Sequence, residues 1–170
     1  RLQANAEKGD AEAQCDLGEM YCNGEGVPQD FAKALEWFRK AADQGNAEAQ
    51  YKHGWMYRKS QGVPQDYTEA LAWFRKAADQ GVAKAQVLVG WHYEKGEGVS
   101  QNYPEAVRWY RMAGEQENAD GQLNLGRMYH LGRGVTQNYP EAMKWLRKAA
   151  EQGEEVAQFL LGGIYEYGEG

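Results

Sequence analysis

Apolar residues recur at helical spacing in short segments that glycine-containing loops separate. Between residues 10 and 23 the apolar positions follow the three- and four-residue steps of one helix face. Gly24 and Gly26 end this segment, because glycine adopts positive φ angles without a Cβ clash. A second helical segment covers residues 31–44. The same pattern then predicts helix pairs at 46–59 and 67–80, 82–95 and 103–116, and 118–131 and 139–152, with a last helix at 154–167.

The helix pairs repeat with a period of 36 residues. The loop sequence 26–30 returns with small changes from Gly62, Gly98 and Gly134. A fixed period of this size predicts a repeat array, here an all-α solenoid of antiparallel helix pairs wound into a right-handed superhelix. Within this single repeat domain we expect the tail of a preceding repeat at 1–9, repeats at 10–45, 46–81, 82–117 and 118–153, and a partial repeat at 154–170.

Residue types at fixed positions of the repeat predict its local structure. We expect an aspartate or asparagine N-cap on each second helix, and in the last three repeats a glutamate three residues later that completes a capping box. The caps are Asp30, Asp66, Asn102 and Asn138, and the glutamates are Glu69, Glu105 and Glu141. Glu117 replaces the glycine that ends the other second helices, which predicts a poorer helix end. The glycine of each first helix, at position 18 and its equivalents, lets the paired helices approach closely, and the four repeated tryptophans fill gaps between layers.

Composition and charge exclude several classes of function. The formal net charge is −6, which argues against general nucleic-acid binding, because phosphate contacts need a basic surface. No apolar run approaches the roughly 20 residues of a membrane span. The two cysteines, Cys15 and Cys22, lie on one helix about 10 Å apart along its axis, beyond the reach of a disulfide. We therefore expect two half-buried free thiols.

The repeated motif carries a family resemblance. The pattern A-x-A-Q-x-x-L-G-x-M-Y-x-x-G-x-G-V-P-Q-D-Y-x-x-A-x-x-W-[FY]-R-K-A-A-x-Q-G, repeated four times, resembles the Sel1-like repeat (SLR) family, whose members are related to tetratricopeptide repeats. The resemblance implies a non-enzymatic adaptor or scaffold for protein–protein interaction, of a bacterial kind. Such proteins are cytoplasmic or exported, and any targeting segment is expected to lie outside this chain.

Candidate catalytic and metal-binding motifs do not form. The Gly-x-Gly loops lack the preceding strand and the following lysine of a phosphate-binding loop. Neither Ser60 nor Ser100 begins a Ser-x-x-Lys motif or lies in a Gly-x-Ser-x-Gly elbow. The paired cysteines of the penicillin-binding branch of the resembled family are missing. His53 and His92 replace apolar residues and are expected to be packed, hydrogen-bonded core residues, and no His or Cys cluster has metal-ligand spacing. We expect no enzyme activity and no cofactor.

Positions that differ between repeats indicate where a partner binds. On the first helices they form one stripe, which in tetratricopeptide-like solenoids lines the concave groove, as the resemblance implies. Two tryptophans beyond the repeated four, Trp55 and Trp91, lie on this stripe among several basic residues. The predicted groove site is Lys52, Trp55, Arg58, Lys59, Lys84, Leu88, Trp91, Lys95, Arg127 and His130.

Several functions remain open for this surface. An aromatic pair among cations favours a protein or peptide partner with carboxylates and an apolar anchor. The alternatives are an assembly module that associates through its end faces or convex side, and a carbohydrate-binding module that stacks sugars on Trp55 and Trp91. These residues also fit ordinary surface lysines and tryptophans packed between helices. The sequence leaves the partner, the compartment and the oligomeric state open.

Overall fold

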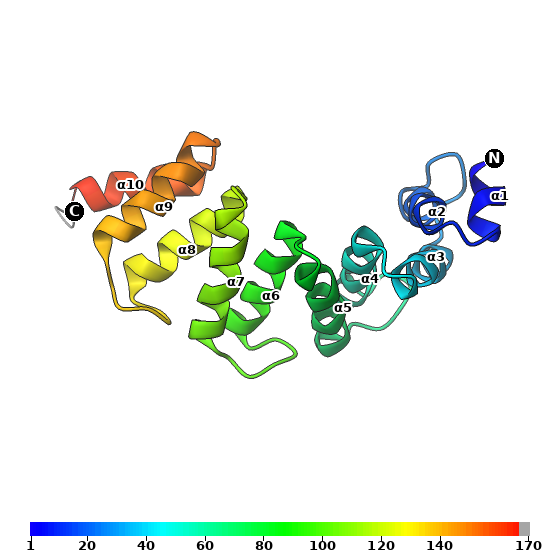
Figure 1. Ribbon diagram of the computed structural model, residues 1–170, viewed down its shortest axis with the longest axis horizontal. Coiled ribbons are helices and arrows are strands. Elements are labelled where there is room, and N and C mark those ends of the chain that lie inside the picture. The colour runs from blue at the N-terminus through cyan, green and yellow to red at the C-terminus, as the bar shows by residue number, and fades with distance from the viewer. Residues whose placement is uncertain (167–170) are drawn as a thin grey trace. The chain divides into compact units, whose positions relative to one another are not determined.

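The chain is all-helical, as the pattern of apolar residues predicts. The computed structural model describes residues 1–166, and these contain ten helices joined by short loops (Figure 1). The helices are α1 (Leu2–Glu7), α2 (Ala11–Asn23), α3 (Phe31–Asp43), α4 (Ala47–Lys59), α5 (Tyr67–Asp79), α6 (Ala83–Lys95), α7 (Tyr103–Glu115), α8 (Ala119–Leu131), α9 (Tyr139–Glu151) and α10 (Glu155–Glu166). They pack as consecutive pairs with a 36-residue repeat, which confirms the solenoid of helix pairs.

The helix ends differ from the expected ranges by single residues, for a physical reason. Most first helices begin one residue later than expected, because that residue is the N-cap. Asp10 and Asn46, for example, accept the backbone N–H of the third helical residue at 2.9 and 2.8 Å. The second helices end one residue earlier, since a glutamine forms the C-cap. The expected last residue of the final helix, Tyr167, lies outside the described residues.

The N-caps of the second helices form as expected, but the capping boxes form only in part. The cap side chain of Asn102, for example, accepts the backbone N–H of Glu105 at 3.0 Å. The reciprocal bond from the glutamate side chain is not made in the described residues. The cap N–H instead donates to a tyrosine carbonyl at the end of the preceding helix, as Asn102 does to Tyr93 at 2.9 Å. The side chain of Glu105 is therefore left for an ion pair with Arg108.

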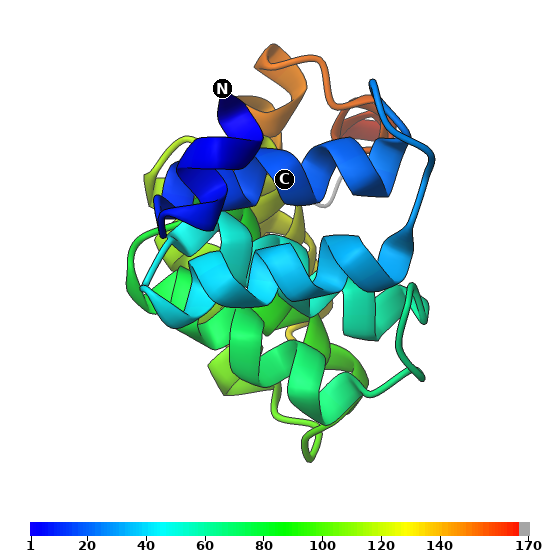
Figure 2. The same cartoon turned by 90° about the vertical axis from the view of Figure 1, so that its right-hand side faces the viewer.

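Small residues set the distance between the two helices of a pair. Figure 2 shows α2 and α3 side by side, joined at one end by their loop. A Cβ atom at Gly18 would lie 2.7 Å from the ring of Phe38, and one at Gly54 would lie 2.8 Å from Phe74. Such contacts are too short for any real side chain, so glycine is required for this close packing. The opposite positions, Ala34 and its equivalents, are fully buried.

Glutamines connect successive repeats through hydrogen bonds. In α4, Gln50 donates to the carbonyl of Ala42 in the preceding repeat at 3.2 Å, and its own side-chain oxygen accepts from Gln80 at 2.8 Å. Gln122 does the same between Gly114 and Gln152. These buried amides satisfy carbonyls at the ends of helices, where no partner exists within the helix. The glutamines recur at fixed positions of the repeat, and this recurrence was the signal in the sequence for their structural role.

The chain divides into two compact units. The first comprises residues 1–80 with helices α1–α5, and the second starts at Gly81 and contains α6–α10. In the first unit the largest buried side chains include Phe38, Phe74 and Met56. In the second they include Trp109 and Tyr110. Three of the four repeated tryptophans are buried as expected, whereas Trp37 is half-buried.

Glu117 gives a prediction for stability, because it adopts a left-handed conformation with φ 62°. The equivalent glycines have φ near 90°. Since a side chain in this region costs about 1 kcal/mol, Glu117→Gly should raise the free energy of unfolding by about that amount. Gly45→Ala is the matched control: its Cβ would meet nothing within 4 Å, so it tests the backbone cost alone and should be destabilising. Thermal denaturation checks both, and an unchanged or lower stability of Glu117→Gly would contradict the strain.

Candidate functional site

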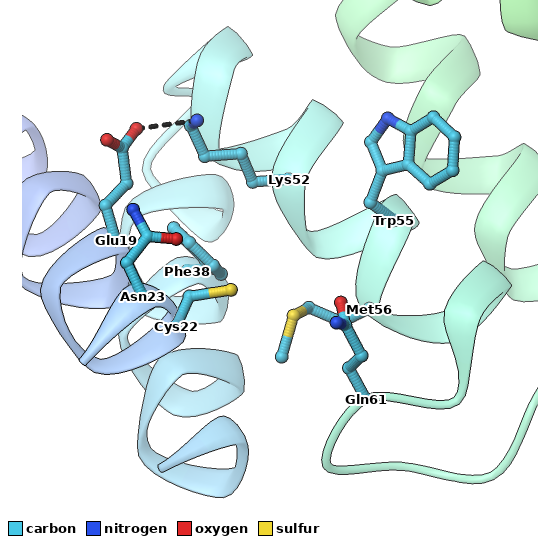
Figure 3. A pocket seen from close by; sticks show the side chains of 8 residues that line it. All are labelled: Glu19, Cys22, Asn23, Phe38, Lys52, Trp55, Met56 and Gln61. Atoms are coloured by element: carbon cyan, nitrogen blue, oxygen red, sulfur yellow. Dashed lines mark ion pairs between the residues drawn. The ribbon is translucent and has the colours of Figure 1, made fainter. Parts of the chain in front are cut away.

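A cavity of about 120 Å³ lies in the first unit, between the first helices of two successive repeats (Figure 3). Residues of α2 and α4 face each other across it, and α3 supplies part of its floor. The lining residues are Glu19, Cys22, Asn23, Phe38, Lys52, Trp55, Met56 and Gln61. Two of them, Lys52 and Trp55, belong to the groove site that the sequence predicts.

The floor of the cavity is apolar and rich in sulfur. Phe38 and Met56 are buried core residues, and in Figure 3 Cys22 and Met56 point toward each other from opposite sides. Both cysteines are free thiols, as expected, but Cys15 is buried and only Cys22 is half-buried. Burial raises the pKa of Cys22, and it raises the pKa of Cys15 to about 12. Because the thiolate is the nucleophile and metal ligand, these thiols favour packing over chemistry at neutral pH.

An ion pair across the edge of the cavity joins the two repeats. The ammonium of Lys52 lies 2.6 Å from a carboxylate oxygen of Glu19 and 3.2 Å from one of Glu48 (Figure 3 shows the pair with Glu19). Burial alone would lower the pKa of Lys52, but hydrogen bonds and charge from these two carboxylates outweigh it and raise the pKa. From its position in the repeat, Lys52 was predicted to be a cation available to a partner. The structure shows that two carboxylates already neutralise it.

Trp55 is held by aromatic and cationic neighbours on one side of the cavity. Its ring meets those of Tyr51 and Phe74 edge-on, with centroids 6.2 and 5.9 Å apart. The cations of Arg58 and Lys59 lie 5.4 and 4.8 Å from the centroid of the same ring. The ring is half-buried, so it is neither a core residue nor a fully exposed one. This arrangement presents an oriented indole with positive charge beside it.

The second unit holds the other six predicted site residues. Lys84, Leu88, Trp91 and Lys95 lie on α6, and Arg127 and His130 lie on α8. Lys95 and Arg127 both face Glu94, at 3.8 and 3.5 Å from the same carboxylate oxygen. His130 packs its ring against Tyr139, with centroids 5.6 Å apart. The ten predicted residues therefore fall into two sets, and one groove that includes both sets stays a prediction.

Glu94 is a buried carboxylate of the second unit that is absent from the predicted groove site. Its side chain is only 2 % exposed, and its second carboxylate oxygen accepts a hydrogen bond from the hydroxyl of Tyr110 at 2.7 Å. Burial and the charge of Glu94 hold the pKa of Tyr110 far above its ordinary value. The other repeats carry Cys22, Arg58, His130 and Glu166 at the same position, and this variety gave no indication of a buried carboxylate.

The histidines occupy different environments. His92 is buried, and its Nδ1 lies 2.8 Å from the carbonyl oxygen of Glu97, as expected for a core histidine. His53 is also buried, but neither ring nitrogen has a hydrogen-bond partner among residues 1–166, which corrects the expectation. In the same residues no group of three His, Cys, Asp or Glu side chains is placed to hold a metal ion. No helix in that range has the length and hydropathy of a membrane span.

Comparison with known proteins gives consistent matches. The family model for the Sel1 repeat matches residues 11–46, 47–82, 83–118, 119–154 and 156–170. No curated protein matches significantly. Among solved structures, c5321, a protective antigen of uropathogenic Escherichia coli with an SLR fold, is 42% identical with a TM-score of 0.96. The match covers 98% of this chain and 36% of that one.

Two further solved structures extend the comparison. A Sel1 repeat protein from Oxalobacter formigenes is 40% identical with a TM-score of 0.87, over 96% of this chain and 47% of that one. The immunity protein Pa5087 from Pseudomonas aeruginosa is 26% identical with a TM-score of 0.59, over 92% of this chain and 58% of that one. This chain thus spans less than half the length of the first two structures. The repeat matches and these identities show that the chain belongs to the Sel1 repeat family.

Proposed function

We propose that this chain is a non-enzymatic adaptor that binds a segment of a partner protein at the cavity between α2 and α4. The observation that carries the proposal is the half-buried indole of Trp55 beside an open cavity with an apolar floor. Buried aromatic anchors and pockets contribute most of the affinity at protein interfaces. A cavity of about 150 Å³ holds a benzene ring, so a cavity of about 120 Å³ has room for one apolar side chain of a partner.

The chemistry of the site favours binding over catalysis. The acidic side chain that lines the cavity, Glu19, is held in an ion pair, and the nearby thiols are protonated at neutral pH because burial raises their pKa. A sugar ligand would also stack on Trp55, but its hydroxyl groups need several hydrogen-bonding partners. The lining offers two side-chain amides and a single carboxylate, which is already in an ion pair. An apolar side chain of a peptide, by contrast, contacts the whole apolar floor of the cavity.

Replacing Trp55 tests the adaptor function. Trp55→Ala should weaken capture of the partner at least tenfold, because truncation of a central interface aromatic has effects of this size. The whole chain serves as bait for extracts of the source cell, and circular dichroism checks that each variant keeps its helix content. Trp91→Ala is assayed separately, as a test of the second unit. Trp55→Phe, which keeps an aromatic ring, should retain most of the binding. Equal capture by wild type and Trp55→Ala would contradict a site at this cavity.

A further inference from the structure

The charges around the cavity in the first unit are separated along the helices. Glu12 and Asp16 are exposed on the N-terminal part of α2, and neither makes an ion pair within residues 1–166. On α4, Glu48 lies near the N-terminal end and Arg58 and Lys59 at the C-terminal end. Because α3 is antiparallel to both of its neighbours, α2 and α4 run in the same direction. The surface is therefore acidic before the cavity and basic after it.

The cavity itself contributes almost no net charge. The ammonium of Lys52, on the rim between the two charged regions, is paired with Glu19 and Glu48. Past the cavity the cations of Arg58 and Lys59 lie 5.4 and 4.8 Å from the centroid of the Trp55 ring. They outnumber the carboxylate of Glu25, which keeps its negative charge while it accepts a hydrogen bond from the side chain of Asn23 at 3.1 Å. The positive charge that the sequence suggested for the whole site is thus confined to one end of this surface.

We infer that the segment bound by this unit carries charges of both signs, with a basic residue on one side of an apolar anchor and an acidic residue on the other. This inference rests on the proposed function and specifies its ligand. The apolar residue enters the cavity beside Trp55. The basic residue faces Glu12 and Asp16, and the acidic residue faces Lys59 and Arg58. A purely acidic segment would be repelled by Glu12 and Asp16, and a purely basic segment by Lys59 and Arg58.

The geometry also sets the length of the segment. Glu48 holds in α4 the same repeat position that Glu12 holds in α2, and Lys59 follows it eleven positions later, which the helical rise makes about 16 Å along the helix. An extended chain covers about 3.3 Å per residue, so the two charged residues of the ligand are about five residues apart. Its anchor lies between them. The binding motif is accordingly about six residues long, shorter than an amphipathic helix needs to form by itself.

The test is a selection from a phage-displayed library of random dodecapeptides on the whole chain, with counter-selection on Trp55→Ala. Enriched peptides should contain an apolar residue between a basic and an acidic residue about five positions apart. Enrichment of purely acidic or purely basic peptides would overturn the mixed-charge ligand while leaving the adaptor function supported. If no peptide prefers the wild type to Trp55→Ala, both the inference and the proposed function are contradicted.

Charge variants then test each end of the site. For a synthetic peptide from the selection, Asp16→Lys and Lys59→Glu should each weaken binding about fivefold in fluorescence anisotropy, as expected for exposed ion pairs. Asp43→Lys and Lys40→Glu on α3 change the net charge of the chain by the same amounts and should leave the affinity unchanged. Equal effects of the site and control variants would show that only the net charge of the chain matters and would overturn the inference.

Discussion

Gly54→Val is expected to lower the free energy of unfolding by about 3 kcal/mol, at the upper end of the usual cost of overpacking a core. The first atom of the new side chain would lie 2.8 Å from two ring carbons of Phe74 and 3.1 Å from the carbonyl oxygen of Ala70. The carbonyl belongs to the backbone of α5, so the ring and the helix must both move. Because α4 carries Trp55, this shift should also weaken partner binding. Urea denaturation followed by circular dichroism measures the loss.

The fifth repeat provides a matched control at the same position. Gly162 is equivalent to Gly54, but a Cβ there would meet no described atom within 4 Å. Gly162→Val should therefore change the stability by less than about 0.5 kcal/mol, in line with the small difference in helix propensity. Similar losses of unfolding free energy in the two variants would mean that valine acts through the helix backbone. The close approach of α4 and α5 would then not explain why glycine is needed at position 54.

At acid pH the wild type is expected to lose about 3 kcal/mol of unfolding free energy through His53, and His53→Leu should remove this loss. His53 lies between the rings of Tyr57 and Trp73, with centroids 5.3 and 4.8 Å away. Its pKa falls to about 4, chiefly because of burial. The charges of Arg39 and, more weakly, of Lys76 also lower the pKa, whereas the charge of Asp43 and the backbone of Leu35 raise it. The unfolded chain binds a proton near pH 6.5, whereas the folded chain does so only near pH 4. Stability is therefore lost as the pH falls from about 6.5 to about 4.

Comparison of the two chains at several pH values isolates this contribution. The shift of about 2.5 pKa units corresponds to about 3 kcal/mol, and the difference in unfolding free energy between His53→Leu and wild type should grow by that amount between pH 7 and pH 4. Leu17 and Leu125 occupy the equivalent positions, so leucine fits this site of the repeat. His53→Gln, which is polar but does not titrate, should also flatten the pH dependence while lowering stability at pH 7. Parallel pH profiles of wild type and His53→Leu would show that His53 does not titrate as its burial implies.

The sequence by itself determined the repeat and most of its local structure. Helix ends depend on residues close in sequence, so the caps at Asp30 and Asn102 and the glycines after each helix could be read from the pattern. Glycine recurs at position 54 and its equivalents, and this recurrence indicated a close contact between helices. The same helix packing occurs in each repeat, so each repeat needs a small residue at this position. Even here the capping boxes were only half right, since the carbonyl of Tyr93 lies far enough from Asn102 in sequence to escape a local pattern.

The tertiary structure alone decided which charges and rings are available to a partner. Lys52 and Glu19 are 33 residues apart, and their 2.6 Å ion pair exists because the packing of α2, α3 and α4 brings them together. Glu94 occupies a variable position, yet the contacts of Tyr110 and Arg127 make it a buried carboxylate. The cavity beside Trp55 likewise depends on the space left between side chains of three helices. Spacing along the chain places a residue on a face of its helix, whereas its ion pairs and burial depend on neighbours that only folding brings together.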